Sequence, residues 1–229
     1  MITVSVVIPA KNEARALDEV LPRLMGLHGV GEVVVVDDGS EDNTDEVASR
    51  HGARVVRHKA SLGNGAAVKA GARVAASDYI VFMDGDGQHR PEEIPRLQEY
   101  MGKYAPGMVV GARSGSGQAS TPRKWANRFY NWFASLITGR RIEDLTSGFR
   151  LVQKDIFLQY LYLLPNGFSY PTTSTMAFCR GGHQVGFVPI DVRERIGKSN
   201  IKPLRDGLRF LLIIFKVGTL YSPLKVFFP

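Results

Sequence analysis

The 229-residue chain has the length of one domain, and 44% hydrophobic with 22% charged residues is a globular composition. This composition excludes a disordered chain, a collagen-like chain and a polytopic membrane protein. The single cysteine, Cys179, excludes an internal disulfide framework and a cysteine-rich zinc site. The net charge of +7 is unevenly placed, with 12 Lys/Arg and 16 Asp/Glu in residues 1–105 but 17 Lys/Arg and 6 Asp/Glu in residues 106–229. An acidic half could hold a metal and a basic half could face phosphates or an anionic surface, although a merely solvated basic face gives the same count.

Strand-like and helix-like segments alternate over the first hundred residues. Short apolar runs predict buried strands, and apolar residues at helical spacing predict the helices between them. In chain order we expect a strand at 3–8, a helix at 13–25, a strand at 32–36, a helix at 42–51, a strand at 54–57, a helix at 65–76, a strand at 79–83, a helix at 91–101 and a strand at 108–111. This order predicts an α/β fold with a mostly parallel central sheet and helices on both faces.

The second half of the chain is less regular. A Gly/Ser/Ala-rich loop at 111–122 leads into an aromatic-rich helix at 123–138, and 146–152 and 184–192 are further expected strands. A basic loop at 193–202 precedes an apolar tail at 203–229 that is punctuated by spaced basic residues. Such a helix can lie in a membrane interface or dock on the core. We therefore divide the chain into a catalytic domain at 1–202 and an interfacial tail at 203–229.

Targeting and membrane-spanning segments are not predicted in this sequence. The apolar start is interrupted at Pro9 and lacks a basic leader, which argues against a signal peptide. No apolar run reaches 18 residues, so no transmembrane helix is expected. The apolar end of the sequence, 226–229, is compatible with the start of a membrane segment.

Short runs of polar residues follow three of the predicted strands. Because ligands of open α/β sheets bind beyond the carboxyl ends of the strands, these residues should share one edge. The five acidic residues that meet there are Glu13, Asp37, Asp38, Asp84 and Asp86. Asp84 and Asp86, directly after a buried strand, are suited to Mg²⁺ or Mn²⁺ shared with a diphosphate. His89 is expected to be a loop or supporting residue.

Other chemistries are disfavoured by the motifs that the sequence lacks. Gly63-Asn64-Gly65 could bring backbone N–H groups near an anion, but it is not a dinucleotide-binding Gly-x-Gly-x-x-Gly. There is also no Walker A motif and no nucleophile elbow. A pI near 9.6 without a recognisable nucleic-acid module gives no support for nucleic-acid binding.

Taken in order, the motifs resemble those of the family 2 glycosyltransferases, specifically the polyprenyl-phosphate branch that includes dolichol-phosphate-mannose-synthase-like enzymes. The resemblance covers roughly residues 2–220. It rests on VIPAKNE at 7–13, VDDGSEDNT at 36–44, GNG at 63–65, DGDGQH at 84–89, GAR at 111–113, DLTSGFR at 144–150 and RIGKS at 195–199. It implies a GT-A fold, a nucleotide-sugar donor and an inverting, metal-dependent hexosyltransferase of the cell envelope.

The resemblance also implies roles for individual residues. Asp84 and Asp86, with Gln88, would hold the divalent ion, and Arg195 would reach the donor phosphates and share the catalytic role. The other implied donor-binding residues are Pro9, Ala10, Lys11, Glu13, Asp37, Asp38, Gly63, Gly85 and Lys198. Lys11 stands where several dolichol-type members have tyrosine, and Asn64 replaces a frequent lysine, so UDP-sugar and GDP-sugar donors both remain open.

A phosphate acceptor is supported by chemistry as well as by resemblance. A sugar hydroxyl nucleophile needs a general base, whereas a lipid phosphate is already an anion and needs positioning and charge screening. The residues that match the acceptor-phosphate positions of the family are Arg113, Arg123, Asn127 and Ser199. A phosphate oxygen would then attack the anomeric carbon in line.

Two alternatives stay open from the sequence. A family 2 enzyme with a soluble or polysaccharide hydroxyl acceptor would need a carboxylate base, for which Asp144 is the obvious candidate. A non-enzymatic nucleotide-binding protein would not need the intact Asp84-x-Asp86 and Arg195. The hypothesis of a polyprenyl-phosphate glycosyltransferase places the protein in the cytoplasm, peripherally on the cytoplasmic face of the membrane. The sequence gives no signal for an oligomeric state.

Overall fold

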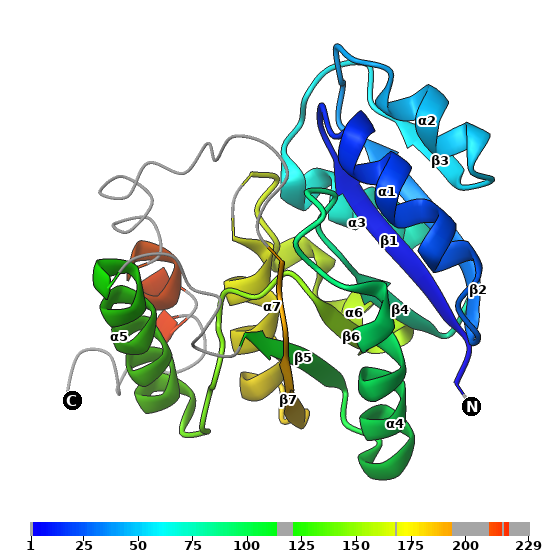
Figure 1. Cartoon of the computed structure of the whole chain (residues 1–229). Coiled ribbons are helices and arrows are strands. Elements are labelled where there is room, and N and C mark those ends of the chain that lie inside the picture. Colours follow the sequence, from blue (N-terminus) through cyan, green and yellow to red (C-terminus); the bar gives the residue numbers. More distant parts are fainter. Residues whose placement is uncertain (1, 114–120, 168, 194–210, 217, 220–229) are drawn as a thin grey trace.

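The computed structural model describes residues 2–113, 121–167, 169–193, 211–216, 218 and 219, with only the backbone for 121–124. A seven-stranded sheet in the order β3-β2-β1-β4-β6-β5-β7 runs through it (Figure 1). Its strands are β1 (Val4–Ala10), β2 (Val30–Asp37), β3 (Arg54–Arg57), β4 (Tyr79–Phe82), β5 (Met108–Arg113), β6 (Arg150–Gln153) and β7 (Val185–Ile190). Only β6 runs antiparallel to its neighbours, which confirms the predicted, mostly parallel sheet.

Helices cover both faces of this sheet, as the alternation of elements predicts. The helices are α1 (Ala14–Met25), α2 (Thr44–Arg50), α3 (Asn64–Val74), α4 (Ile94–Tyr104), α5 (Thr121–Thr138), α6 (Lys154–Gln159) and α7 (Tyr170–Arg180), with 3₁₀ turns η1 (Pro91–Glu93) and η3 (Leu161–Leu163). Side chains of α1, α2 and α4 pack on one face, and those of α3, α6 and α7 pack on the other.

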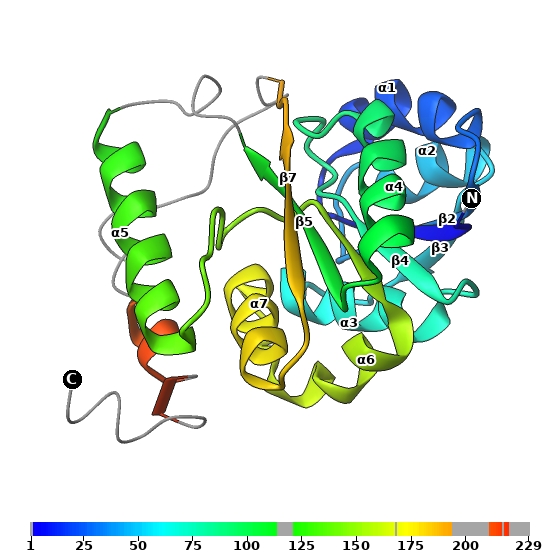
Figure 2. The same ribbon diagram turned by 90° about the horizontal axis from the view of Figure 1, so that it is seen from below.

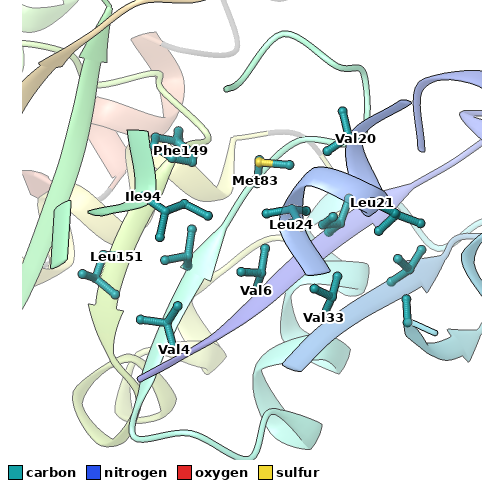
Figure 3. Packing of buried hydrophobic residues seen from close by; sticks show 14 of the residues in the cluster. Val4, Val6, Val20, Leu21, Leu24, Val33, Met83, Ile94, Phe149 and Leu151 are labelled. Carbon is teal, nitrogen blue, oxygen red and sulfur yellow. The ribbon is translucent and has the colours of Figure 1, made fainter. Parts of the chain in front are cut away.

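The central strand β1 is buried along its whole length. Val4 and Val6 join the cluster under α1 and α4, while Val7 points to the opposite cluster, as the two-residue repeat of a strand requires. On α1 the apolar residues that recur at helical spacing are all buried (Leu17, Val20, Leu21 and Leu24). Figure 3 shows part of this packing, with Val20, Leu21 and Leu24 facing the sheet.

Helix α5 stands apart from the sheet, and residues 211–216 form a short helical segment beside it (Figure 2). A third apolar cluster joins them, in which Ala134 and Ile137 of α5 meet Met176 of α7 and Ile214. Within the described residues, no helix combines the length and apolarity needed to span a membrane. Most of the predicted tail at 203–229 lies outside the described residues, so its membrane role stays a prediction.

One expectation from the sequence was wrong, and two helices were not predicted. The strand predicted at 146–152 begins only at Arg150, because the carboxylate of Asp144 accepts the N–H groups of Thr146 and Ser147 and turns the chain there. The helices α6 and α7 were not predicted. Helix α7 is rich in Thr and Ser, which have modest helix propensity, and it is buried on nearly all sides, so no amphipathic period marks it.

Candidate functional site

The carboxyl ends of β1, β2 and β4 lie next to one another, because these strands are parallel neighbours. Ala10 is paired with Asp37, and the N–H of Asp38 donates to the carbonyl of Ala10 at 2.8 Å. On the other side, Gly85 approaches β1 so closely that an added Cβ would lie 3.1 Å from the carbonyl oxygen of Pro9. The structure thus brings these predicted donor-binding segments together.

The loop after β1 is fastened to the loop after β2. Asn12 adopts a left-handed conformation with φ of 57°, and its Oδ1 accepts the N–H of Glu41 at 2.8 Å. The N–H of Glu13 donates to Oγ1 of Thr44 at 3.0 Å. Lys11 is exposed at the same loop. The backbone here is therefore fixed, while the side chain of Lys11 is open to a ligand.

The two aspartates at the end of β2 have different surroundings. Asp38 accepts four hydrogen bonds of 2.7–2.8 Å, from His58, Ser61, Leu62 and Gly63. Burial raises the pKa of Asp38, but these hydrogen bonds outweigh it and hold the pKa below its usual value. Asp37 is fully buried; its Oδ1 accepts the N–H of Ser40, and its Oδ2 lies 3.3 Å from Nε of Arg57 without a hydrogen-bond partner among the described residues. Asp38 shapes the 58–63 loop, and Asp37 has hydrogen-bonding capacity to spare.

The turn at 63–65 contacts another loop through its glycines. The N–H of Gly65 donates to the carbonyl of Gly167 at 3.1 Å, and the N–H of Ala66 donates to the carbonyl of Asn166 at 2.9 Å. A Cβ at Gly65 would collide with the carbonyl oxygen of Pro165. These N–H groups are therefore not available to an anion, contrary to one expectation from the motif. A donor-binding role for Gly63 stays a prediction.

Asp84 and Asp86 follow β4 at the centre of this edge. The carboxylate of Asp84 lies against Gly148, where a Cβ would sit 2.8 Å from its Cγ and Oδ1 and closer still to Oδ2. Asp86 is buried, and its Oδ1 accepts the N–H of Gln88 at 3.1 Å. Among the described residues, no three His, Cys, Asp or Glu side chains group into a metal site. Two carboxylates with few further protein ligands fit an ion that shares a substrate diphosphate and keeps several waters, as Mg²⁺ does.

An arginine–aspartate pair lies beside these carboxylates. Arg113 donates to both oxygens of Asp144, through Nε at 2.8 Å and Nη2 at 2.9 Å, and to Oγ1 of Thr146 at 2.5 Å. Burial disfavours both charges, yet the pair holds the pKa of Asp144 below and that of Arg113 above its usual value. The charge of Asp84 also raises the pKa of Arg113. Arg113, the predicted acceptor-side arginine, is thus close enough to Asp84, a predicted metal ligand, for the two charges to interact.

His89 is a buried supporting residue, as expected. Its ring stacks on Phe149 with centroids 5.2 Å apart, and its backbone pairs with Val192. Burial lowers its pKa to about 4, partly opposed by the charge of Asp86, so the ring is neutral near pH 7. The N–H of Arg193 donates to the carbonyl of Gln88 at 2.8 Å. The chain therefore leaves the described region beside the Asp84–His89 loop, two residues before Arg195 in the sequence.

Four predicted residues have side chains outside the described part of the structure, namely Arg123, Arg195, Lys198 and Ser199. Asn127 is described and half-buried on α5. Three residues near Asp84 were not predicted as site residues from the sequence, namely Gly148, Arg150 and Tyr170. The motif at 144–150 contains two of them, but only the fold shows what they contact.

Comparison with known proteins identifies the family. The sequence model described as Glycosyl transferase family 2 matches residues 5–161, which include the ends of β1, β2 and β4 and the 144–150 loop. The chain belongs to glycosyl transferase family 2. It is therefore a glycosyltransferase, as the motifs predict.

Relatives of this family 2 glycosyltransferase match the predicted branch. It is 30% identical to an undecaprenyl-phosphate mannosyltransferase of Micrococcus luteus, over 85% of the chain and 86% of the relative. It is 35% identical to a dolichol-phosphate mannosyltransferase of Pyrococcus furiosus over 72% of the chain, but this match spans only half of that relative. Glucosyl-3-phosphoglycerate synthase of Mycobacterium tuberculosis, crystallised with Mn²⁺, UDP and glucosyl-3-phosphoglycerate, has a TM-score of 0.73 at 22% identity and covers 94% of this chain and 80% of its own. This likeness confirms the GT-A fold.

Proposed function

We propose that this glycosyltransferase moves a sugar, with inversion, from a nucleotide-diphosphate sugar to a polyprenyl phosphate at a membrane surface. The relatives in Micrococcus luteus and Pyrococcus furiosus are named for transfer to undecaprenyl phosphate and dolichol phosphate. The structural neighbour was crystallised with UDP and Mn²⁺, which supports a nucleotide-sugar donor and a divalent metal cofactor. The catalytic domain at 1–202 carries this chemistry.

The state of Asp144 is the observation that carries the choice of acceptor. A hydroxyl acceptor needs a carboxylate base, and Asp144 is the candidate from the sequence. Its two oxygens accept hydrogen bonds from Arg113 and from the N–H groups of Thr146 and Ser147. Its pKa is held below the usual value, which makes it a weak base. A phosphate acceptor needs no base, and the site offers the arginine that such an acceptor requires.

The chain's own residues have separable tasks in this reaction. Asp84 and Asp86, with Gln88, hold the divalent ion, which stabilises the departing diphosphate when bound. Asp144 orients the guanidinium of Arg113, so that its Nη1 group, which takes no part in the hydrogen bonds to Asp144 and Thr146, faces the acceptor phosphate together with Arg123, Asn127 and Ser199. Arg195 and Lys198 contact the donor phosphates. The donor is bound by Pro9, Ala10, Lys11, Glu13, Gly63 and Gly85, and by one of the two aspartates Asp37 and Asp38.

The donor half of the proposal is tested by ligand-induced stabilisation. UDP-sugars and GDP-sugars are screened for a rise in melting temperature, each with and without Mn²⁺ or Mg²⁺. We expect a metal-dependent rise with one nucleotide, lost in Asp86→Ala and kept in the matched control Asp155→Ala, an exposed aspartate on α6. An unchanged rise in Asp86→Ala would refute the metal site.

The acceptor half is tested by turnover. The donor found in that screen is offered with undecaprenyl phosphate in vesicles or with soluble sugar hydroxyl acceptors. We expect an anomerically inverted lipid-linked product, identified by NMR, and no transfer to hydroxyl acceptors. Efficient transfer to a hydroxyl acceptor would refute the phosphate assignment and return Asp144 to consideration as base.

The outer face of α5 supports a position at the membrane surface. Trp125, Phe129, Trp132 and Leu136 recur at spacings of four, three and four residues, so they form one stripe, and each is 47–69% exposed. Leu212 and Phe215 of the adjacent segment are also exposed. Exposed basic residues accompany the stripe (Arg128, Arg140, Arg141 and Lys216). Aromatic side chains with flanking positive charge suit an anionic lipid surface.

Vesicle binding tests this peripheral association with the cytoplasmic face. We expect the full chain to co-sediment with vesicles rich in phosphatidylglycerol, and Phe129→Ser with Trp132→Ser to release it. The control is Tyr162→Ser, an exposed aromatic residue on η3 outside the stripe. Equal co-sedimentation of the stripe variant and the control would refute the role of α5.

A further inference from the structure

Arg150 is a completely buried charge to which the proposed reaction assigns no task. It lies on β6, where it pairs with Phe82 of β4, two residues before Asp84. Its Nε has no hydrogen-bond partner among the described residues. Burying a guanidinium is costly, so the surroundings that compensate for it point to its role.

Helix α7 supplies most of that compensation. Nη1 of Arg150 donates to the carbonyl of Pro171 at 2.9 Å, to Oγ of Ser174 at 2.8 Å and to Oγ1 of Thr175 at 3.1 Å. The guanidinium carbon lies 5.5 Å from the ring centre of Tyr170. Two of the buried hydroxyl residues of α7, Ser174 and Thr175, therefore form part of a polar lining for one arginine.

The rest of this network holds the backbone beneath Asp84. Nη2 of Arg150 donates to the carbonyl of Ser147, and the hydroxyl of Tyr170 donates to the carbonyl of Gly148 at 2.9 Å. Gly148 is the residue against which the carboxylate of Asp84 lies. Two consecutive carbonyls of the backbone beside Asp84 are thus anchored by hydrogen bonds.

Charge adds a second link between Arg150 and this carboxylate. Burial lowers the pKa of Arg150, and the negative charges of Asp144 and Asp84 oppose that shift. The negative charges of these two carboxylates therefore favour the charged form of the buried guanidinium.

We propose that Arg150 and Tyr170 are positioning residues, which fix the Ser147–Gly148 backbone and thereby set the place of the Asp84 carboxylate for the divalent metal. Neither side chain touches the ion. Residues that orient a metal ligand commonly affect metal affinity as much as activity. The inference rests on the proposed metal site at Asp84 and Asp86.

The test measures Mn²⁺ affinity rather than turnover. Mn²⁺ is titrated into the full chain with saturating UDP, and free Mn²⁺ is followed by electron paramagnetic resonance; UDP binding without metal is measured in parallel. Tyr170→Phe removes one hydroxyl and keeps the ring, and we expect it to raise the Mn²⁺ dissociation constant about fivefold. Arg150→Lys keeps the positive charge but loses the planar set of guanidinium N–H donors, and we expect the Mn²⁺ dissociation constant to rise about tenfold or more. Metal-free UDP affinity should be unchanged in both.

Val152→Ala is the matched control, since Val152 is a fully buried residue on the same face of β6. It should lower the melting temperature and leave Mn²⁺ affinity unchanged. Wild-type Mn²⁺ affinity in Tyr170→Phe, or an equal loss in Val152→Ala, would overturn the inference, and Tyr170→Phe decides it alone if Arg150→Lys does not fold. The variant Asp86→Ala separates failure of the metal site from failure of the positioning role. If Asp86→Ala still binds Mn²⁺, the metal site itself is refuted. If Asp86→Ala loses Mn²⁺ binding while Tyr170→Phe binds Mn²⁺ with wild-type affinity, only the positioning role is refuted.

Discussion

Replacing Gly148 by alanine should disable the metal site while leaving the fold intact. The backbone of Gly148 is not in the left-handed region, so alanine is conformationally acceptable there. The new Cβ would lie 2.8 Å from Cγ and Oδ1 of Asp84 and closer to Oδ2, nearer than real Cβ atoms approach. Because the carbonyl of Gly148 is held by Tyr170, the carboxylate of Asp84 is the group that must move.

The two expected effects differ in size for a physical reason. A carboxylate at the end of a rotatable side chain relieves the clash cheaply, so the free energy of unfolding should fall by only about 1 kcal/mol, the low end for overpacking. A displaced ligand is costly for the ion, and we expect the dissociation constant for Mn²⁺ with UDP to rise about 10- to 100-fold. Urea denaturation and Mn²⁺ titration measure the two quantities on the same samples.

A double-mutant cycle makes the reasoning refutable. In an Asp84→Ala background the clash no longer exists, so Gly148→Ala should add almost nothing to either effect. Gly26→Ala is the control, because its Cβ would meet its nearest neighbour at an ordinary 3.7 Å. Wild-type Mn²⁺ affinity in Gly148→Ala, or effects that simply add in the double variant, would show that Asp84 is not positioned by Gly148.

Three further predictions concern stability. Asp144→Asn should lower the free energy of unfolding by about 3 kcal/mol, because it leaves the largely buried Arg113 without its counter-ion. Chemical denaturation measures this free energy. A loss below about 1 kcal/mol would contradict the prediction. Gly65→Ala should cost about 1–3 kcal/mol in the same assay, since its Cβ meets the rigid carbonyl of Pro165 rather than a movable side chain, and a neutral result would mean that the 165–167 loop yields. The pKa of His89 falls from an unfolded value near 6.5 to about 4, so the unfolded chain binds the proton more tightly and stability should decline by about 3 kcal/mol as pH falls from about 6.5 to 4. His89→Gln should flatten that part of the stability–pH curve, and an unchanged slope would assign it to other groups.

The fold could be predicted where local pattern and tertiary environment agree. Continuous β-branched runs such as 33–36 are buried on both faces of the sheet, and the apolar face of α1 recurs at helical spacing, so both were predictable. Helix α7 was not predictable, because its Thr and Ser residues are all buried and two of them, Ser174 and Thr175, bond a distant arginine that no local pattern indicates. The start of β6 was misplaced for a similar reason, since the carboxylate of Asp144 bonds the N–H groups that a strand would have used.

The site divides in the same way. Asp84 and Asp86 were predictable because a polar pair directly after a buried strand must lie at the ligand-binding edge. The different roles of Asp37 and Asp38 were not predictable. Consecutive residues at the end of a strand point to opposite sides, and only the 58–63 loop determines which carboxylate has its hydrogen-bonding capacity filled. The role of Gly148 depends on the antiparallel insertion of β6 between β4 and β5, which strand propensity does not indicate.

That insertion gives the 144–150 loop a mechanical role in the proposed reaction. At one end Asp144 holds the guanidinium of Arg113, and at the other Arg150 anchors the backbone to α7, with Gly148 seated against Asp84 between them. In the proposed reaction, the acceptor-side arginine and the donor-side metal ligand are thus positioned by one short segment, which Arg150 and Tyr170 anchor. A change at Arg150 should therefore alter the Michaelis constants for both the metal–donor complex and the lipid phosphate, whereas a change at an isolated binding residue should alter only one. A shift confined to the donor would mean that the two ends of the loop relax independently.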